Sequence, residues 1–149
     1  MPTLVSGGTF QNNWKNILDK LKSVLRTEFK GALPVYIGDD GIEGSQFLRI
    51  MPQGSTLTSL STDSEEREYN IELIYYFDEK MIKTKTMDHI LRYTSRIEAL
   101  IHDNIIMTLS DSSKALNCKI DSTEFNSATE DGIYTVTMEW SCNYVGNIG

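Results

Sequence analysis

The chain has 149 residues, of which 14 are basic and 21 acidic, and its formal net charge is -7 at pH 7. This length suits a single domain over residues 1–149. A composition of 40% hydrophobic and 23% charged residues is typical of a globular protein, not of a disordered one. The acidic balance argues against a protein that binds duplex DNA by neutralising its phosphates. It is compatible with a soluble protein, or with one that lines a passage for a polyanion without binding it.

Signals for membrane insertion, secretion and catalysis are absent from the sequence. No apolar run approaches the roughly 20 residues that span a bilayer, and no signal peptide is evident at the beginning of the chain. Cys118 and Cys142 lack metal-binding spacing, so a cytosolic place of synthesis with free thiols is the default. Nucleophile-elbow, phosphate-loop and zinc-protease motifs are not found. We therefore expect no catalytic residue, no metal and no cofactor, and we expect that the chain is not an enzyme.

The first predicted element is an amphipathic helix of about 16–18 residues. Asn12 or Asn13 can cap its beginning, because an asparagine side chain accepts a hydrogen bond from a free amide of the first turn. Gly31 is the expected left-handed residue at its end, and Pro34 prevents continuation. The apolar residues at helical spacing are Trp14, Ile17, Leu18, Leu21, Val24, Leu25 and Phe29.

Two short strands are predicted next, at residues 34–37 and 46–51, with an Asp- and Gly-rich turn between them. Pro52 is expected to end the second strand. Residues 53–66 are rich in Ser and Thr and predict a long loop without regular structure, which is uncommon in a compact domain and often functional. Two interpretations stay open: a mobile hairpin tip, or an arm that orders against another subunit through Leu57 and Leu60.

Residues 67–77 alternate clearly and predict the second strand of this hairpin. One face carries Tyr69, Ile71, Leu73, Tyr75 and Phe77. Ile74 and Tyr76 lie on the opposite face, near the end of the strand, and this end is expected to be covered by something outside the domain.

A second amphipathic helix is predicted over residues 86–101. Thr84 or Thr86 can cap it, and Asp88 suits the positive end of the helix dipole. Residues 105–107 predict a short strand or a buried turn. The apolar stripe of the helix is Met87, Ile90, Leu91, Thr94, Ile97, Leu100 and Ile101.

A final hairpin joins a strand at residues 116–120 to one at residues 133–145, whose even-numbered residues are apolar and odd-numbered residues mostly polar. Matching the apolar faces predicts three cross-strand pairs. In that register Cys118 and Cys142 are roughly 13 Å apart, too far for a disulfide. The predicted pairs are Ile120 with Val136, Cys118 with Met138, and Leu116 with Trp140.

These elements predict a two-layer α+β fold, with a mainly antiparallel sheet and two amphipathic helices packed on one face. The other face carries Glu72, Thr135, Thr137 and Glu139, and is expected to meet water or a neighbouring protein.

In element order and length, nearly the whole chain resembles the tail terminator and head–tail completion proteins, minor tail proteins of tailed bacteriophages. The resemblance rests on four features: the opening helix with Asn13-Trp14-Lys15-Asn16-Ile17, the extended hairpin over residues 47–77, the helix over residues 86–101, and the closing strand with Val136-Thr137-Met138-Glu139-Trp140.

The resemblance implies a structural virion protein that is weakly associated alone and forms a ring, commonly a hexamer, at the end of the tail tube. There it terminates tail growth and joins the tail to the head. The implied partners are copies of itself, the tail tube protein and the head connector protein, with DNA passing through the lumen without specific binding. The implied location is the tail or neck of the virion, assembled in the host cytoplasm.

A ring built head to tail needs two different contact surfaces on each subunit. We expect one surface in the Ser/Thr-rich loop together with the Ile74/Tyr76 end of its hairpin, and the other on the polar sheet face. The expected contact residues are Gln53, Thr56, Leu57, Leu60, Ile74, Tyr76, Thr137 and Glu139. The alternatives are a small α+β ligand-binding or enzymatic domain that uses a cleft beside the 52–66 loop, and a host adaptor domain without a role in assembly.

Overall fold

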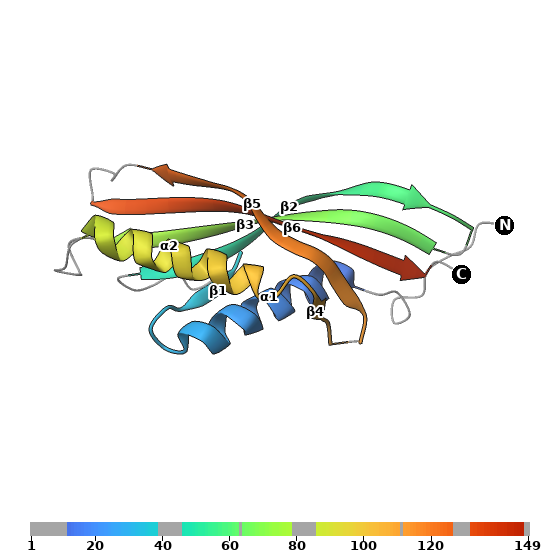
Figure 1. Ribbon diagram of the computed structural model, residues 1–149, viewed down its shortest axis with the longest axis horizontal. Helices are drawn as coiled ribbons and strands as arrows, with labels where there is room; N and C mark the ends of the chain where they lie inside the picture. The colour runs from blue at the N-terminus through green and yellow to red at the C-terminus, as the bar shows by residue number, and fades with distance from the viewer. Residues whose placement is uncertain are drawn as a thin grey trace.

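The computed structural model describes residues 12–38, 46–62, 64–78, 86–110, 112–126 and 132–147. Two helices lie on one face of a six-stranded sheet (Figure 1), which confirms the predicted α+β class. The strand order is β1-β2-β3-β6-β5-β4, and all neighbours are antiparallel except β1 and β2. The elements are α1 (Asn13–Phe29), β1 (Val35–Ile37), β2 (Gln46–Leu60), β3 (Ser64–Asp78), α2 (Thr86–His102), β4 (Met107–Thr108), β5 (Lys114–Asn126) and β6 (Ile133–Asn147).

Helix α1 begins as the sequence predicts, because the Asn12 side chain accepts a hydrogen bond from the Lys15 amide at 3.1 Å. The prediction for its other end is wrong by one residue. Lys30, not Gly31, has the positive φ, at 53° with ψ of -128°, and its amide donates to the Arg26 carbonyl at 2.8 Å. Phe29, the last helical residue, is buried, and the chain turns away directly after it.

Helix α2 confirms the second predicted helix, but part of its apolar stripe stays exposed to solvent. Ile90 and Ile97 are buried, whereas Met87 and Leu91 are 51% and 46% exposed. The expected capping residue Thr84 and the lysines of residues 80–85 lie outside the described residues. After the helix, residues 105 and 106 are half exposed, so the buried turn predicted there is wrong, and Met107 begins the short strand β4.

The predicted long loop is wrong, because residues 53–60 continue β2 and residues 64–66 begin β3. Pro52 does not end the strand, since β1 pairs with β2 only as far as Ile50 and β2 is an edge strand beyond that point. A proline needs no ladder partner at an edge, and here it adjoins a register shift between Pro52 and Gly54. Further on, the Thr58 hydroxyl donates to the Glu66 carbonyl at 3.0 Å and adds a side-chain link across the pair.

The predicted register of the final hairpin is also wrong. Trp140 pairs with Ile120 instead of Leu116, and Val136 pairs with Phe125. Two register shifts in β5 cause the difference, since each bulge places an extra residue on one strand and slips all later pairs. A pattern that alternates strictly in β6 could not reveal bulges that lie in its partner.

The core lies between the helices and the central strands β3 and β6. Every second residue of β3 from Tyr69 to Phe77 is buried, as predicted, and so is every second residue of β6 from Val136 to Tyr144. Trp140, Tyr75 and Phe77 are the largest fully buried side chains. At one end of the molecule β2, β3 and β6 extend past the beginning of α1 (Figure 1).

Candidate functional site

The open face of the sheet brings together four of the residues that the sequence singled out. Ile74 pairs directly with Thr137, Tyr76 lies two residues further along β3, and Glu139 lies two residues further along β6. All four side chains are partly exposed. They are therefore accessible on one continuous surface, opposite the helices.

An aromatic cluster occupies one corner of this face. Phe47 stacks on Tyr76 with ring centroids 4.5 Å apart, and Tyr36 meets Phe47 edge-on at 6.0 Å. The Arg49 guanidinium lies 5.2 Å from the centroid of the Tyr76 ring, a distance at which a cation is attracted to the ring face. We call Tyr36, Phe47, Arg49, Ile74 and Tyr76 the aromatic corner. The sequence indicated only its two β3 residues, because the other three depend on the register of β1 and β2.

An acidic row lies beside the aromatic corner. Glu72 pairs directly with Glu139, and Glu124 lies on the next strand opposite Thr137. Burial raises the pKa of Glu72, and the charges of Glu139 and Glu124, with a hydrogen bond to Glu139, raise it further. Two carboxylates directly opposite each other destabilise a sheet. The isolated chain therefore tolerates an unfavourable charge arrangement on this face.

The far end of the β2–β3 hairpin forms a separate surface, which we call the distal hairpin (residues 53–67). Leu57 and Leu60 are 42% and 63% exposed. They pair with Arg67 and Glu65, whose odd numbers place them on the same face of β3 as Tyr69, the helix side. Thr56 pairs with Glu68 on the open face, and Gln53 occupies the bulge.

The expected single patch of loop and hairpin end is thus divided in two. Arg67 and Ile74 are seven residues apart along β3, which corresponds to roughly 24 Å. The distal hairpin and the aromatic corner lie at different ends of the same hairpin, and their apolar side chains point to different faces. One chain therefore carries two distinct exposed apolar surfaces.

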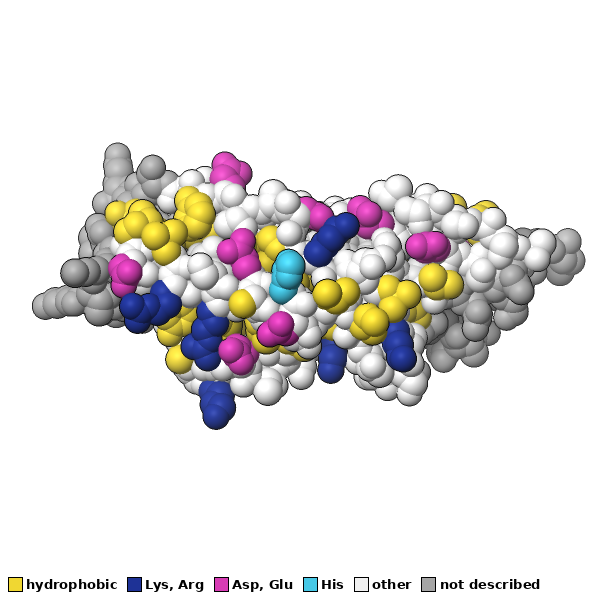
Figure 2. Space-filling model, in the orientation of Figure 1, with side chains coloured by type: hydrophobic (Ala, Val, Ile, Leu, Met, Phe, Trp, Pro, Cys, Tyr) yellow, Lys and Arg dark blue, Asp and Glu magenta, His cyan; other side chains and the backbone are white. Residues whose placement is uncertain are grey.

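The sequence did not predict a third apolar surface. Met87 and Leu91 project from the beginning of α2, and Phe125 near the end of β5 is 47% exposed. Figure 2 shows hydrophobic side chains gathered at this end of the molecule. The helical spacing of Met87 and Leu91 predicts core packing. No feature of the sequence indicates that the apolar stripe of α2 extends past the surface that the helix covers.

A buried polar cluster connects several elements by hydrogen bonds. The Gln46 side-chain oxygen accepts a hydrogen bond from the Tyr75 hydroxyl at 2.7 Å and lies 2.9 Å from His89 Nε2. The Gln46 amide donates to the Ala32 carbonyl at 3.0 Å. Burial, assisted by the nearby Arg92 charge, lowers the pKa of His89. The cluster ties β2, β3 and α2 to the segment after α1 with satisfied hydrogen bonds.

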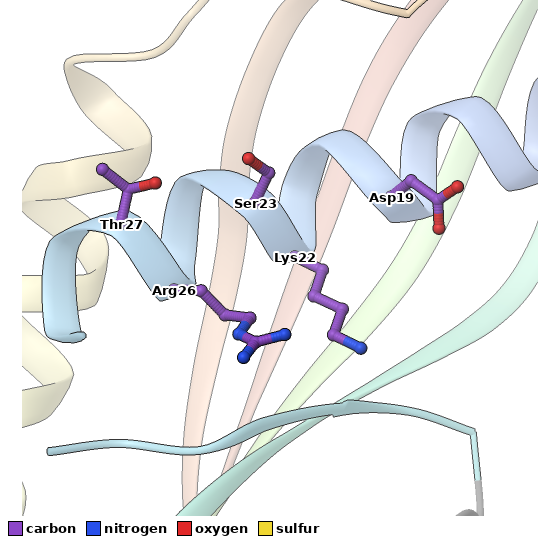
Figure 3. A pocket seen from close by; sticks show the side chains of 5 residues that line it. All are labelled: Asp19, Lys22, Ser23, Arg26 and Thr27. Atoms are coloured by element: carbon purple, nitrogen blue, oxygen red, sulfur yellow. The ribbon is translucent and has the colours of Figure 1, made fainter. Parts of the chain in front are cut away.

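Surface pockets formed by the described residues lie along α1 and beside β5. The pocket of about 480 Å³ lies on the exterior of α1. Figure 3 shows that its side chains leave the helix in different directions and do not converge on one point. Among the described residues, no group of three or more His, Cys, Asp or Glu is placed to hold a metal ion, and no helix is long and apolar enough to cross a membrane. The pocket is lined by Asp19, Lys22, Ser23, Arg26 and Thr27.

Comparison with known proteins finds solved structures that share the fold. No protein-family model matches the chain, and no curated protein matches it. Among solved structures, a chain described as "Virion of native gene transfer agent (GTA) particle" is similar with a TM-score of 0.66 and 10% sequence identity, over 92% of this chain and 100% of that one. A second solved protein is similar with a TM-score of 0.58 and 16% identity, over 91% and 97% of the two chains. At these identities the likeness establishes a shared fold over almost the whole length.

Proposed function

We propose that this chain is a structural virion protein that forms a ring at the end of a phage tail tube, where it terminates tail growth and joins the tail to the head. The observation that carries the proposal is the likeness to a chain of a gene transfer agent virion, which spans that chain completely and 92% of this one. A match of this extent concerns the whole fold, not a common substructure within it.

The distribution of exposed apolar side chains supports assembly. A subunit of a head-to-tail ring needs two different surfaces that contact each other between copies. The aromatic corner and the distal hairpin are two such surfaces, on opposite faces and at opposite ends of one hairpin. In the proposed ring, the distal hairpin of one copy extends over the next, with Leu57 and Leu60 as its apolar contacts on one face. Thr56 on the opposite face and Gln53 in the bulge are further proposed contacts.

The polar sheet face supplies the remaining proposed contacts. Thr137 and Glu139 lie next to the aromatic corner, and the repulsion between Glu72 and Glu139 is relieved if a cationic group of a neighbour lies between them. Acidic groups that stay uncovered would face the lumen. A negative lumen lets DNA pass without being held, because like charges repel.

The proposed partners are other copies of the chain, the tail tube protein and the head connector protein, and the proposed location is the tail or neck of a virion assembled in the host cytoplasm. The alternative is a ligand-binding or enzymatic role beside the 52–66 segment. The described residues of that segment form a paired hairpin, and the pockets along α1 and beside β5 lie elsewhere in the fold.

Native mass spectrometry of the purified chain over a wide concentration range tests the proposal. A series of oligomers that increases with concentration and stops at one closed size, about six copies, is the expected result. A strict monomer at the highest concentration that also fails to bind purified tail tubes would contradict it. A copurified small molecule on a monomer would favour the enzymatic alternative.

A further inference from the structure

The two cysteines, expected to be far apart, meet across β5 and β6. The first register shift in β5 leaves residues 117 and 118 opposite Cys142 alone. Two residues of one strand facing one of the other make a β-bulge. Asn117 has the left-handed φ of 53°, and the Cys118 amide donates to the Ile105 carbonyl at 2.8 Å. The bulge turns the Cys118 side chain to the covered face, where Cys142 also lies.

The two thiols are buried close to each other. Each cysteine is 1% exposed and neither is in a disulfide. The side chains of Cys142 and Cys118 are hydrogen-bonded to each other, and Cys118 Sγ lies 3.5 Å from the Ala115 carbonyl oxygen. Opposed residues of antiparallel strands have Cα atoms about 4.5–5.5 Å apart, within the span of roughly 4.4–6.8 Å that disulfides bridge.

A pocket of about 240 Å³ is lined in part by one of the two cysteines. Cys118 is among its lining residues, and the other four are exposed, so the pocket opens to solvent. Cys142 is not among them. The pocket therefore adjoins Cys118 and not Cys142. The other lining residues are His102, Ile105, Asn117 and Lys119.

We propose that Cys118 and Cys142 form an oxidisable dithiol, which a small peroxide that enters this pocket converts into a disulfide between β5 and β6. The Cys118 thiolate attacks one peroxide oxygen, the O–O bond breaks, and the leaving hydroxide takes a proton to become water. The Cys118 sulfenic acid is then attacked by the Cys142 thiolate, the S–O bond breaks, and the released hydroxide becomes a second water. Two thiols are oxidised and one peroxide is reduced.

The electrostatics of the pair agree with this order. The hydrogen bond from Cys142 lowers the pKa of the Cys118 thiol, against the effect of burial. The same hydrogen bond, together with burial, raises the pKa of the Cys142 thiol. The cysteine that lines the pocket is thus also the one that ionises more readily, as the attacking thiol must.

The disulfide would link the strands after folding is complete. Its timing rests on the proposed virion function, because a virion passes from a reducing cytoplasm to oxidising surroundings at release. The chemistry itself does not depend on that function, and its test on the purified chain is independent of any assembly assay.

The experiment treats the folded, purified chain with hydrogen peroxide and then counts thiols by alkylation after unfolding. The expected result is the loss of both thiols and a peptide in which Cys118 is linked to Cys142, with two hydrogens lost from the intact mass. Because the link closes a loop of about 24 residues, the Tm should rise by roughly 5–10 °C. Oxidation of the exposed Met87 serves as the control for an active oxidant.

Two single variants test the order of the steps. In Cys142→Ala, peroxide should leave a sulfenic acid at Cys118 that dimedone traps, because no second thiol resolves it. In Cys118→Ala, Cys142 should stay reduced at the same dose. Equal trapping at both positions would overturn the role given to Cys118.

The proposal is overturned if the wild-type chain keeps two alkylatable thiols while Met87 is oxidised. It is also overturned if the only disulfides found join separate chains. Both outcomes are measured on the unmodified sequence, so neither depends on a variant that folds.

Discussion

The two halves of the β2–β3 hairpin use the same pair of strands in opposite ways. In the half under the helices, Leu48, Ile50, Leu73 and Tyr75 are fully buried. In the distal hairpin the strands stay paired, but Leu57 and Leu60 face solvent. The first half is specified by the hydrophobic core of its own chain. The core does not account for the exposed leucines of the second half, and we propose that they contact other subunits.

We propose that folding stability depends on the first half and assembly on the second. Substitutions in the two halves should therefore separate the free energy of unfolding from the ability to form oligomers. Four sets of substitutions test the separation, from the largest expected effect on stability to the smallest.

The largest effect is expected in the core next to the hairpin. Trp140→Ala should lower the free energy of unfolding by about 3–5 kcal/mol, because it leaves a large cavity against Ile71. Leu57→Ala, also a truncation of a large apolar side chain, should change it by less than about 0.5 kcal/mol. Urea unfolding measures both. Equal losses would show that the distal hairpin is part of the folding core.

A smaller loss is expected from the buried polar cluster. Gln46→Ala removes the acceptor of the Tyr75 hydroxyl and the partner of His89, and should cost about 1–3 kcal/mol because a buried hydroxyl is left unsatisfied. Gln53→Ala is the matched control at an exposed position, with an expected change below about 0.5 kcal/mol. Thermal unfolding at neutral pH compares the two, and similar Tm values would contradict the structural role of the cluster.

Removing the acidic repulsion should stabilise the isolated chain slightly. The pKa of Glu72 is raised in the folded state, so its protonated form stabilises the fold fully below about pH 4.5, and this stabilisation is lost as pH rises through the raised pKa. Glu72→Gln should therefore be more stable than the wild type at pH 7 and equally stable near pH 4.

Urea midpoints at the two pH values provide the measurement. Glu66→Gln is the control, because Glu66 lies on the same face of β3 but opposite Val145 instead of a second carboxylate. The interpretation fails if Glu72→Gln gives the same change at both pH values.

The smallest effect on stability, and the largest on assembly, is expected at the distal hairpin. Leu57→Lys with Leu60→Lys should leave the free energy of unfolding within about 0.5 kcal/mol, since both side chains are already exposed. Burying two lysines in a subunit contact is costly, so oligomers should disappear from native mass spectra.

The control carries the same added charge on an exposed part of α1, as Ser23→Lys with Thr27→Lys. If the control also loses the oligomers, the effect comes from net charge and not from the hairpin surface. Point substitutions are preferable to deletion of residues 53–64, because β3 pairs with β6 from Ser64 onward and a deletion would expose that strand.

The sequence predicted the elements whose pattern depends on burial. The alternation of apolar residues in β3 from Tyr69 to Phe77 and their helical spacing in α1 both correspond to the side chains that the core covers. The distal hairpin has no such apolar pattern, because both of its faces are exposed and its Ser and Thr residues suit either a loop or an edge strand. The sequence also predicts that Pro52 ends a strand. Whether a strand tolerates proline depends on where it becomes an edge strand, and here that depends on how far β1 extends.

The positions of the two cysteines could not be predicted because they depend on the bulge at residues 117–118. A bulge changes the face of a single residue through its backbone conformation, and Asn117 is only one of several asparagines that could adopt it. For the candidate surface, the sequence indicated Ile74, Tyr76 and the polar face. It could not indicate Phe47 and Arg49, which join them only through the pairing of β2 with β3.

The most direct test of the proposed function is electron microscopy of particles from cells that produce this protein with an antibody epitope tag. We predict gold label at the junction of head and tail on intact particles, and tails of uncontrolled length without label when the distal hairpin carries Leu57→Lys with Leu60→Lys. Particles with normal heads and tails that carry no label at the junction would contradict the account.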